Sequence, residues 1–182
     1  DEEVLYATGS VGLEYSQNQD GTYTVVGIGT CTDAHVIIPR VYEGAAVTAI
    51  GNTAFYNCNT IEEITIPASI KEIGTKVFDK AGSLHTVYYN SAYGSDENPF
   101  LKVNSIRKIV FGGTEIPSSV CKNAHSIEEV VILGGVTSIG NEAFSGCWGL
   151  TDITIPDSVT SIDDCAFYHC ASLQSITIPA SV

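Results

Sequence analysis

Two stretches near the end of the chain carry nearly the same pattern: VTSIGNEAFSGCWGLTDITIP at residues 136–156 and VTSIDDCAFYHCASLQSITIP at residues 159–179. They are offset by 23 residues. Self-similarity with a period of about 20 to 50 residues is the signature of a repeat architecture. Extending the comparison toward the N-terminus gives one apolar anchor per repeat, at Ile61, Leu84, Ile106, Ile127, Leu150 and Leu173.

Each anchor fixes further apolar positions in its repeat. The residues three and five positions after it are apolar in every repeat, and the residue six positions before it is Phe in all repeats but one. One unit of this length cannot bury such a set of side chains, but stacked units align them in continuous columns. The sequence therefore predicts a solenoid with one buried column containing Phe55, Phe78, Phe144 and Phe167.

The segment that follows each anchor predicts a short strand, because Leu-x-x-Ile-x-Ile alternates at its end and directs apolar residues inward. Successive strands should stack in parallel about 4.8 Å apart, and prolines such as Pro67 and Pro156 should end them. The preceding Ile-Gly-x-x-Ala-Phe-x-x-Cys segment spaces Ala, Phe and Cys as a helix would. It therefore predicts one or two turns of α- or 3₁₀-helix on the outer side.

These motifs resemble the leucine-rich repeat family, although Ile-Pro-x-Ser-Val stands where that family has Asn after the strand. The closer resemblance is to its bacterial surface branch, the BspA-like repeat proteins. It extends over about residues 35–182, is most specific in the repeats beginning at Val47, Val136 and Val159, and is weak at about residues 87–122. The resemblance implies an α/β repeat solenoid: a right-handed, leucine-rich-repeat-like arc with one parallel sheet and short outer helical turns.

The first part of the chain does not fit the repeat. Residues 11–15 and 22–28 are predicted strands joined by the turn sequence NQDG at 18–21, which favours a β-hairpin. Such a hairpin would cover the first coil, whose strand edges would otherwise be open. We therefore expect an N-terminal β-hairpin cap at residues 1–34 and leucine-rich-type repeats of about 23 residues at 35–182.

Two further expectations concern the limits of the repeats. The path from Ile38 to Ile50 is five residues longer than the equivalent path from Ile66 to Ile73, so residues 40–45 should bulge as a loop. No polar cap follows the last repeat, so the array is expected to continue past Val182.

Composition and charge exclude several functions. The apolar fraction of 44% is enough for a core, which excludes wholesale disorder. A net charge of −13 with only 8 Lys and Arg argues against nucleic acid and anionic lipid as partners. No apolar run approaches the roughly 18 residues of a membrane span, so no direct membrane insertion is expected. Since no basic segment precedes an apolar stretch at Asp1, any signal peptide is expected to have been removed.

The cysteines are predicted to be mostly buried thiols. Cys58, Cys147 and Cys170 share one inward position that Ala or Val fills in other repeats. A bridge between Cys147 and Cys170, in adjacent coils, stays open as an alternative. Cys165 falls at an outward position and is the expected reactive thiol.

No metal, cofactor or catalytic residue is predicted. The cysteines lack the paired spacing of a zinc site, and the run SDEN at 95–98 lacks the spaced ligands of a calcium loop. Cys121 and His125 have no third partner that the repeat register brings near, so surface residues are a better interpretation than a Cys–His nucleophile. The chain is therefore not expected to be an enzyme.

The exposed side of the parallel sheet is the expected site of function. Four positions after their anchors, Tyr88, Val110 and Val131 would form an apolar stripe across the central coils. Lys108 and Glu129, two positions after their anchors, would lie beside it, and Tyr93 could contribute from the following loop. The alternative is that these residues are simply β-formers on a face that curves away or is covered by residues 91–98.

The resemblance implies a non-catalytic, extracellular or cell-surface bacterial module for protein–protein recognition. It would be adhesin-like, with a host extracellular matrix or cell-surface protein as partner, and the acidic rim would favour a basic or polar partner. One alternative is a purely structural spacer that projects another domain. A more remote one is an accessory domain of a hydrolase.

Overall fold

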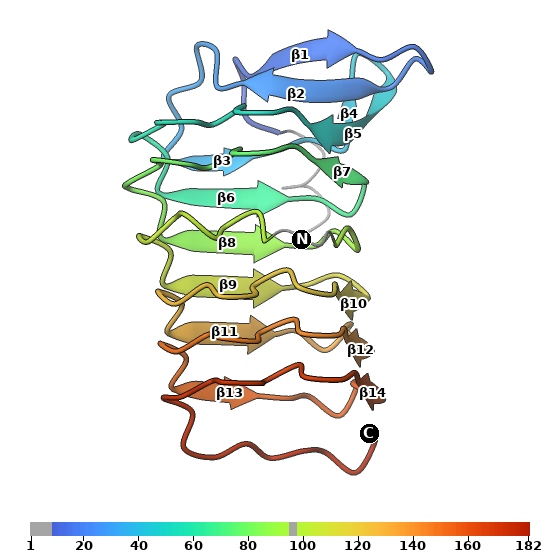
Figure 1. Cartoon of the computed structure of the whole chain (residues 1–182). Helices are drawn as coiled ribbons and strands as arrows, with labels where there is room; N and C mark the ends of the chain where they lie inside the picture. The colour runs from blue at the N-terminus through green and yellow to red at the C-terminus, as the bar shows by residue number, and fades with distance from the viewer. Residues whose placement is uncertain (1–8, 95–97) are drawn as a thin grey trace.

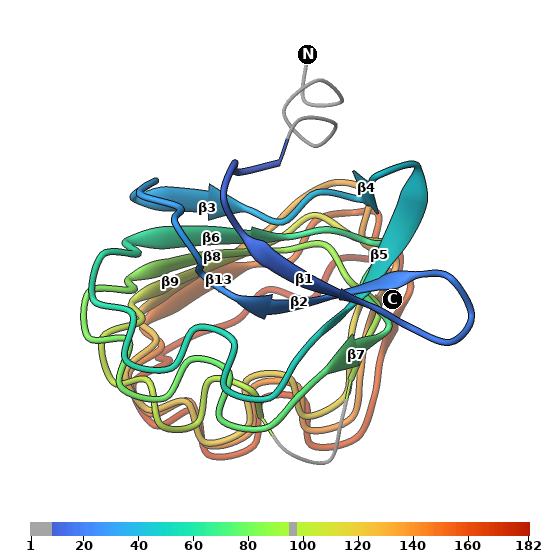
Figure 2. The ribbon, with the colours of Figure 1, turned by 90° about the horizontal axis from the view of Figure 1, so that it is seen from above.

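The computed structural model describes residues 9–94 and 98–182. The chain winds through stacked coils that progress from the N-terminal to the C-terminal end (Figure 1). Viewed along the stack, each coil has a long strand on one side, a short strand on a second side and a wall of turns on a third (Figure 2). The solenoid predicted from the repeat is therefore confirmed.

The largest sheet is parallel and has six strands in the order β13-β11-β9-β8-β6-β3. Its register pairs Glu63 with Thr86, Thr86 with Lys108, and Lys108 with Glu129, which is the pairing that the repeat spacing predicts. The strands are β3 (His35–Ile37), β6 (Glu63–Ile66), β8 (Thr86–Tyr89), β9 (Lys108–Phe111), β11 (Glu129–Ile132) and β13 (Asp152–Thr154).

Short strands form the second side of the coils. Toward the C-terminus, β10 (Glu115–Ile116), β12 (Ser138–Ile139) and β14 (Ser161–Ile162) pair in parallel. Toward the N-terminus, β7 (Glu72–Ile73) pairs in parallel with β5 (Ala45–Ile50). The equivalent position of the coil between β7 and β10 is Ser95, which lies outside the described residues.

An antiparallel hairpin lies where the NQDG turn predicts one. It consists of β1 (Glu14–Gln17) and β2 (Tyr23–Gly27), and β2 pairs in parallel with β5. The hairpin therefore extends the side of short strands. The edge of the six-stranded sheet is met instead by Ser10, which donates its backbone N–H to Ile37 O at 2.7 Å and accepts from Ile37 N at 3.0 Å through its hydroxyl. The division of the chain at residues 34 and 35 stays a prediction.

The extra residues after Pro39 form a second, tighter hairpin. Strand β4 (Val41–Tyr42) pairs antiparallel with the start of β5. Glu43 and Gly44 connect them with φ values of 48° and 81°, which is the left-handed backbone of a two-residue hairpin turn. The insertion predicted as a loop is thus largely an ordered β-structure.

The predicted helical turns on the outer side are wrong, because the described residues contain no helix. Along the outer wall, successive backbone N–H groups alternate between acceptors in the next coil and acceptors in their own coil. The N–H groups of Thr53, Phe55 and Asn57 donate to carbonyls of the next coil, at Thr75, Val77 and Asp79. The intervening N–H groups donate to carbonyls only three residues back in the same coil. An α-helix needs consecutive i to i−4 bonds and a 3₁₀-helix consecutive i to i−3 bonds, so this alternation of donors excludes both.

Left-handed residues keep this wall regular. Two positions four residues apart have positive φ in each well-formed coil, as at Thr53 (58°) and Asn57 (58°). In the coil before the last, the equivalent pair is Glu142 (54°) and Gly146 (74°). The N–H groups of these left-handed residues themselves bond along the stack, from Thr53 to Thr75 O and from Asn57 to Asp79 O.

The predicted aromatic column forms the core. Phe55, Phe78 and Phe100 stack with ring centroids 5.7 and 5.6 Å apart, and Phe144 stacks on Phe167 at 5.5 Å. The first four of these rings are at most 2% exposed, whereas Phe167, in the last coil, is partly buried. The column is interrupted once, where Cys121 takes the place of Phe.

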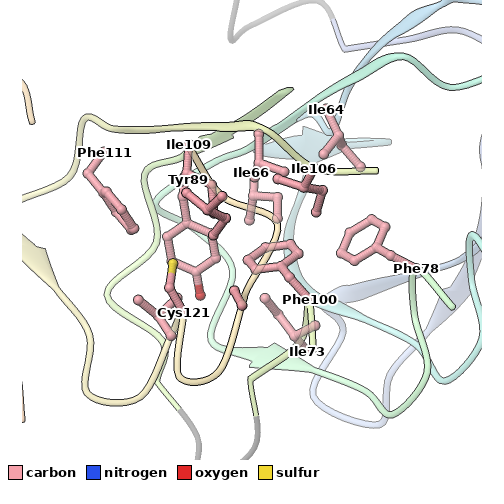
Figure 3. Packing of buried hydrophobic residues seen from close by; sticks show 14 of the residues in the cluster. Ile64, Ile66, Ile73, Phe78, Tyr89, Phe100, Ile106, Ile109, Phe111 and Cys121 are labelled. Atoms are coloured by element: carbon pink, nitrogen blue, oxygen red, sulfur yellow. The ribbon is translucent and has the colours of Figure 1, made fainter. Parts of the chain in front are cut away.

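The break at Cys121 is filled from the opposite side of the core. The strands β8 and β9 end in Tyr89 and Phe111, where other coils have Ile, and both rings point inward toward Cys121 (Figure 3). Tyr89 lies 6.1 Å from Phe100 and 5.9 Å from Phe111, and Phe111 lies 5.7 Å from Phe144, measured between ring centroids. Two large strand residues and one small wall residue thus preserve the core volume where the repeat pattern is weakest.

Candidate recognition surface

The outer face of the six-stranded sheet presents two parallel rows of side chains. One row joins Thr65, Tyr88, Val110, Val131 and Thr154, and the other joins His35, Glu63, Thr86, Lys108, Glu129 and Asp152. Parallel pairing places neighbours in a row about 4.8 Å apart. The structure therefore brings together five of the six predicted site residues: Tyr88, Val110, Val131, Lys108 and Glu129.

The apolar part of this face is smaller than the sequence predicts. Tyr88 and Val131 are partly exposed, but Val110 is only 8% exposed. Val110 lies between Tyr88 and Val131 in its row and beside Lys108 on its own strand, so it forms the floor of the face. The prediction of Val110 as an exposed contact residue is therefore wrong, and the accessible apolar groups are Tyr88 and Val131.

The side chain of Tyr88 reaches across the outer face of the sheet to His35. Its ring stacks on the imidazole of His35 with centroids 5.3 Å apart and an interplanar angle of 18°. His35 also has Nε2 2.8 Å from Thr65 Oγ1 and Nδ1 3.4 Å from Glu63 Oε2. These contacts explain why Thr65, at an outward position, is only 4% exposed. They give the N-terminal end of the face an ordered aromatic surface.

Charged residues of neighbouring coils pair with each other along the face. Lys108 Nζ lies 2.8 Å from Glu129 Oε1, and Arg107 Nε lies 3.2 Å from Glu128 Oε1. The hydrogen bond to Glu129 raises the pKa of Lys108, so this amine stays charged at neutral pH. The carboxylates outnumber the two cations, which gives this end of the face an acidic character.

Tyr93 does not belong to this face. Its carbonyl oxygen accepts a hydrogen bond of 2.6 Å from the hydroxyl of Tyr89, which points into the core, and its N–H donates to Ser91 Oγ at 2.8 Å. It lines a hollow with Thr75, Lys76 and Asn98, beyond the core from the sheet face. The prediction that Tyr93 supports the sheet-face site is wrong, because the loop after β8 turns inward at Tyr89. The described part of that loop therefore does not cover the face.

The repeat register also reaches a residue that the sequence analysis did not assign to the face. His35 pairs with Glu63 in the same row as Lys108. The signal was present, since Ile38 occupies the same repeat position as Ile66, which places His35 opposite Glu63. The stacking partner Tyr88, two strands away, could not be inferred from the register alone.

The other predicted candidates are accounted for individually. The six cysteines are free thiols, with Cys121 and Cys147 fully buried and Cys165 exposed. Cys147 Sγ points to Cys121 O at 3.1 Å, and Cys170 Sγ points to Phe144 O at 3.2 Å, so the two thiols are directed to separate carbonyls. His125 stacks on Trp148 at 4.3 Å, away from the buried Cys121 thiol.

Metal-ligand clusters and membrane-spanning helices are both absent from the described residues. Among residues 9–94 and 98–182, no group of three or more His, Cys, Asp or Glu is placed to hold a metal ion. Within the same ranges, no helix is long and apolar enough to cross a membrane. Most of the SDEN run lies outside the described residues.

The stacked parallel strands, inward apolar ladders and short second-side strands define a leucine-rich-repeat type of β-solenoid. The model of the BspA type leucine rich repeat region matches residues 38–114 and 114–182, with 6 copies. The chain belongs to this family. A comparison with curated protein sequences finds no match.

Solved structures with a similar fold come from bacteria. A leucine-rich repeat protein of T. pallidum is 23% identical over 97% of this chain and 73% of its own, with a TM-score of 0.53. One from Eubacterium ventriosum is 18% identical over 92% and 52%, with a TM-score of 0.59. A leucine rich cell surface protein of Faecalibacterium prausnitzii is 25% identical over 94% and 54%, with a TM-score of 0.48. The chain thus spans about half the length of the last two.

Proposed function

We propose that the chain is a non-catalytic module for protein–protein recognition that binds its partner on the outer face of the six-stranded sheet. It would act outside the cell or at its surface as an adhesin-like domain, with a host extracellular matrix or cell-surface protein as partner. Leucine-rich repeats are protein-interaction scaffolds as a family, and a stacked sheet offers a large regular surface without a deep pocket. Tyr88, Val131, Lys108 and Glu129 would make the contacts.

The alignment of Tyr88 with Val131 in one row, with the Lys108–Glu129 pair beside it, carries the proposal. An aromatic ring and an apolar side chain next to charged groups is the composition typical of an interface core and its rim. Tyr88 is held by its stack on His35, so little side-chain entropy is lost when a partner binds it. The carboxylates of the row favour a partner with basic or polar groups.

A binding assay with matched variants tests this function. The intact chain is immobilised and exposed to a panel of extracellular matrix proteins, and each hit is measured with the double variant Tyr88→Ser/Val131→Ser. The control is Tyr168→Ser/Val41→Ser, which makes the same chemical changes at side chains that are 59% and 54% exposed elsewhere. The proposal expects at least a tenfold loss of affinity, roughly 1.4 kcal/mol, in the first variant and little change in the second.

The purely structural spacer is the competing function, and the same assay separates the two. A spacer would show no binding that depends on Tyr88 or Val131, while both variants would keep the melting temperature of the parent. Equal loss of binding in both variants would also contradict the proposed face, because the contacts would then lie elsewhere on the coil.

A further inference from the structure

The outer wall of the solenoid opens into a hollow on the side opposite the recognition surface. Elsewhere, backbone N–H groups join each turn of the wall to the next, as from Cys121 to Ala143 O and from Phe144 to Ala166 O. In the described ranges, no such backbone bond joins the turn at 76–80 to that at 98–103, or that at 98–103 to the one at 119–124. The turn at 98–103 thus lacks the backbone bonds that join other turns of the wall, and a cavity of about 840 Å³ lies beside it.

Lysines from three successive turns line this cavity. Lys76, Lys102 and Lys122 all contribute, and among the lining residues that the structure describes Asp79 is the one acidic side chain. The whole chain has only 8 Lys and Arg and a net charge of −13, so three lysines in one cavity are a marked local excess of positive charge. Lys122 is paired with Glu142, so Lys76 and Lys102 are the cations that would attract an anion into the cavity.

The base of the hollow is rigid. The side-chain amide of Asn98, which is 8% exposed, donates to Lys122 O at 2.8 Å, and its oxygen accepts from Phe100 N at 2.7 Å. Tyr93 is held through its carbonyl by Tyr89 and through its N–H by Ser91, whose hydroxyl in turn donates to Ile70 O at 2.8 Å. Groups fixed in this way bind a ligand with a smaller loss of conformational entropy.

The remaining lining has the composition of a sugar site. Tyr93, Pro99 and Leu101 offer apolar surface, while Thr75 and Asn123 offer hydrogen-bonding groups. A sugar ring has an apolar face of C–H groups and a rim of hydroxyls, which match these two kinds of contact. The lysines add charge-assisted donors for an anionic substituent.

We propose that this cavity, the lysine hollow, binds an acidic saccharide whose sugar units carry carboxylate or sulfate groups. The hollow lies apart from the sheet face, so the two surfaces would engage different ligands. Lys76 and Lys102 would contact the anionic groups directly. Lys122, whose Nζ lies 2.6 Å from Glu142 Oε2, would contribute while remaining paired.

Titration calorimetry with defined oligosaccharides tests the proposal. The probes are a hexasaccharide of galacturonate, which carries carboxylates, and a heparin-derived hexasaccharide, which carries sulfates; a neutral maltohexaose is the reference. At least one acidic probe should bind with a Kd below about 1 mM, maltohexaose should bind at least about tenfold more weakly, and added salt should weaken the acidic complex. The preferred acidic probe identifies the anionic group.

Two matched variants locate the binding site. Lys76→Gln/Lys102→Gln should weaken binding of the acidic probe about tenfold or more, because two contacts to the anion are lost. Lys71→Gln/Lys80→Gln changes the net charge equally at residues outside the lining, and Lys80 Nζ lies over the ring of Tyr56 at 5.3 Å. This control should change the affinity less than about twofold, as should Tyr88→Ser.

Several results would overturn the proposal. It is overturned if both acidic hexasaccharides fail to bind, or if maltohexaose binds equally well. The two lysine double variants could lose affinity to the same extent, which would indicate attraction by overall charge alone. Binding of inorganic sulfate or hexaglutamate as tight as that of the saccharides would show a general anion site without sugar recognition. Melting temperatures within a few degrees of the parent keep each comparison valid.

Discussion

The ring of Tyr88 stacks on the imidazole of His35 at 5.3 Å although their strands, β8 and β3, are separated in the sheet by β6. Tyr88 reaches over Thr65, the residue of β6 that lies between them, and His35 closes the contact with a 2.8 Å hydrogen bond to that threonine. Three coils are thereby joined on the outside of the sheet. This contact orders the recognition surface independently of the core beneath it.

The contact predicts energetic coupling between the two rings. Aromatic pairs contribute about 0.5 to 1.5 kcal/mol, and the 41% exposure of the His35 side chain favours the lower end. His35→Ala and Tyr88→Ala should therefore show a coupling free energy of about 0.5 kcal/mol in a double-mutant cycle. Urea unfolding of the parent and three variants measures it. Strictly additive free energies of unfolding would mean that the stack contributes nothing to stability.

A second prediction concerns the aromatic column. Phe78 lies between Phe55 and Phe100 and is fully buried, so Phe78→Ala removes two ring contacts and leaves a cavity. We expect a loss of about 3 to 5 kcal/mol in the free energy of unfolding. Tyr168→Ala, at an exposed ring on the same wall, should cost less than about 0.5 kcal/mol. Similar costs for the two variants in chemical denaturation would contradict the stacked core.

The break in the column gives a third prediction. Restoring the repeat consensus by Cys121→Phe should destabilise the chain by about 1 to 3 kcal/mol, because Tyr89 and Phe111 already occupy the space. The same change should become favourable when Tyr89→Ile and Phe111→Ile are made with it. This sign reversal is checked by comparing urea midpoints of the single, double and triple variants. A Cys121→Phe chain as stable as the parent would show that the core there is loosely filled.

The repeat spacing predicted most of what recurs from one coil to the next. It gave the parallel register from Glu63 to Glu129, the inward column of Phe55 and Phe78, and the alignment of Tyr88 with Val131, because equivalent residues of stacked coils must coincide. The prediction of outer helical turns failed for a physical reason. The spacing of Ala54, Phe55 and Cys58 fits a helix and a chain of short turns equally well, and only hydrogen bonds to the next coil decide between them.

The predictions for Val110 and Tyr93 failed because the surroundings of these residues do not recur from coil to coil. Whether Val110 is covered depends on the sizes and directions of its neighbours across coils, which the period does not specify. Tyr93 follows the strand in the one coil whose sequence departs most from the repeat, so its path could not be extrapolated from other coils. The lysine hollow was not predicted for the same reason. Lys76, Lys102 and Lys122 line one cavity at the place where the turn at 98–103 lacks the backbone bonds of the wall.

The left-handed positions of the outer wall give a fourth prediction. Gly146 has φ 74°, and an added Cβ would collide with Asn123 Oδ1. Gly146→Ala should therefore cost about 1 to 2 kcal/mol, or more if Asn123 cannot move. Conversely, His169→Gly, at the equivalent position with φ 56°, should be neutral or stabilising despite the loss of a side chain. Thermal unfolding of both variants tests this, and a stabilised Gly146→Ala chain would contradict the observed backbone.

The buried thiols predict a loss of stability in alkali. Burial raises the pKa of Cys147 to about 12, from an ordinary value of 9.0, because the thiolate would lose its hydration. A raised folded pKa means that the stabilising contribution is complete below the unfolded pKa and is lost as the pH rises toward the folded one. The parent should therefore lose more stability than Cys147→Ala between pH 9 and 12, by about 1.4 kcal/mol per pH unit.

Ala is a conservative replacement, since Ala81 and Ala124 fill this position in other coils. Urea unfolding at several pH values gives both slopes, and titrating groups that do not interact with Cys147 cancel in their difference. Parallel slopes would place the thiol of Cys147 in contact with water.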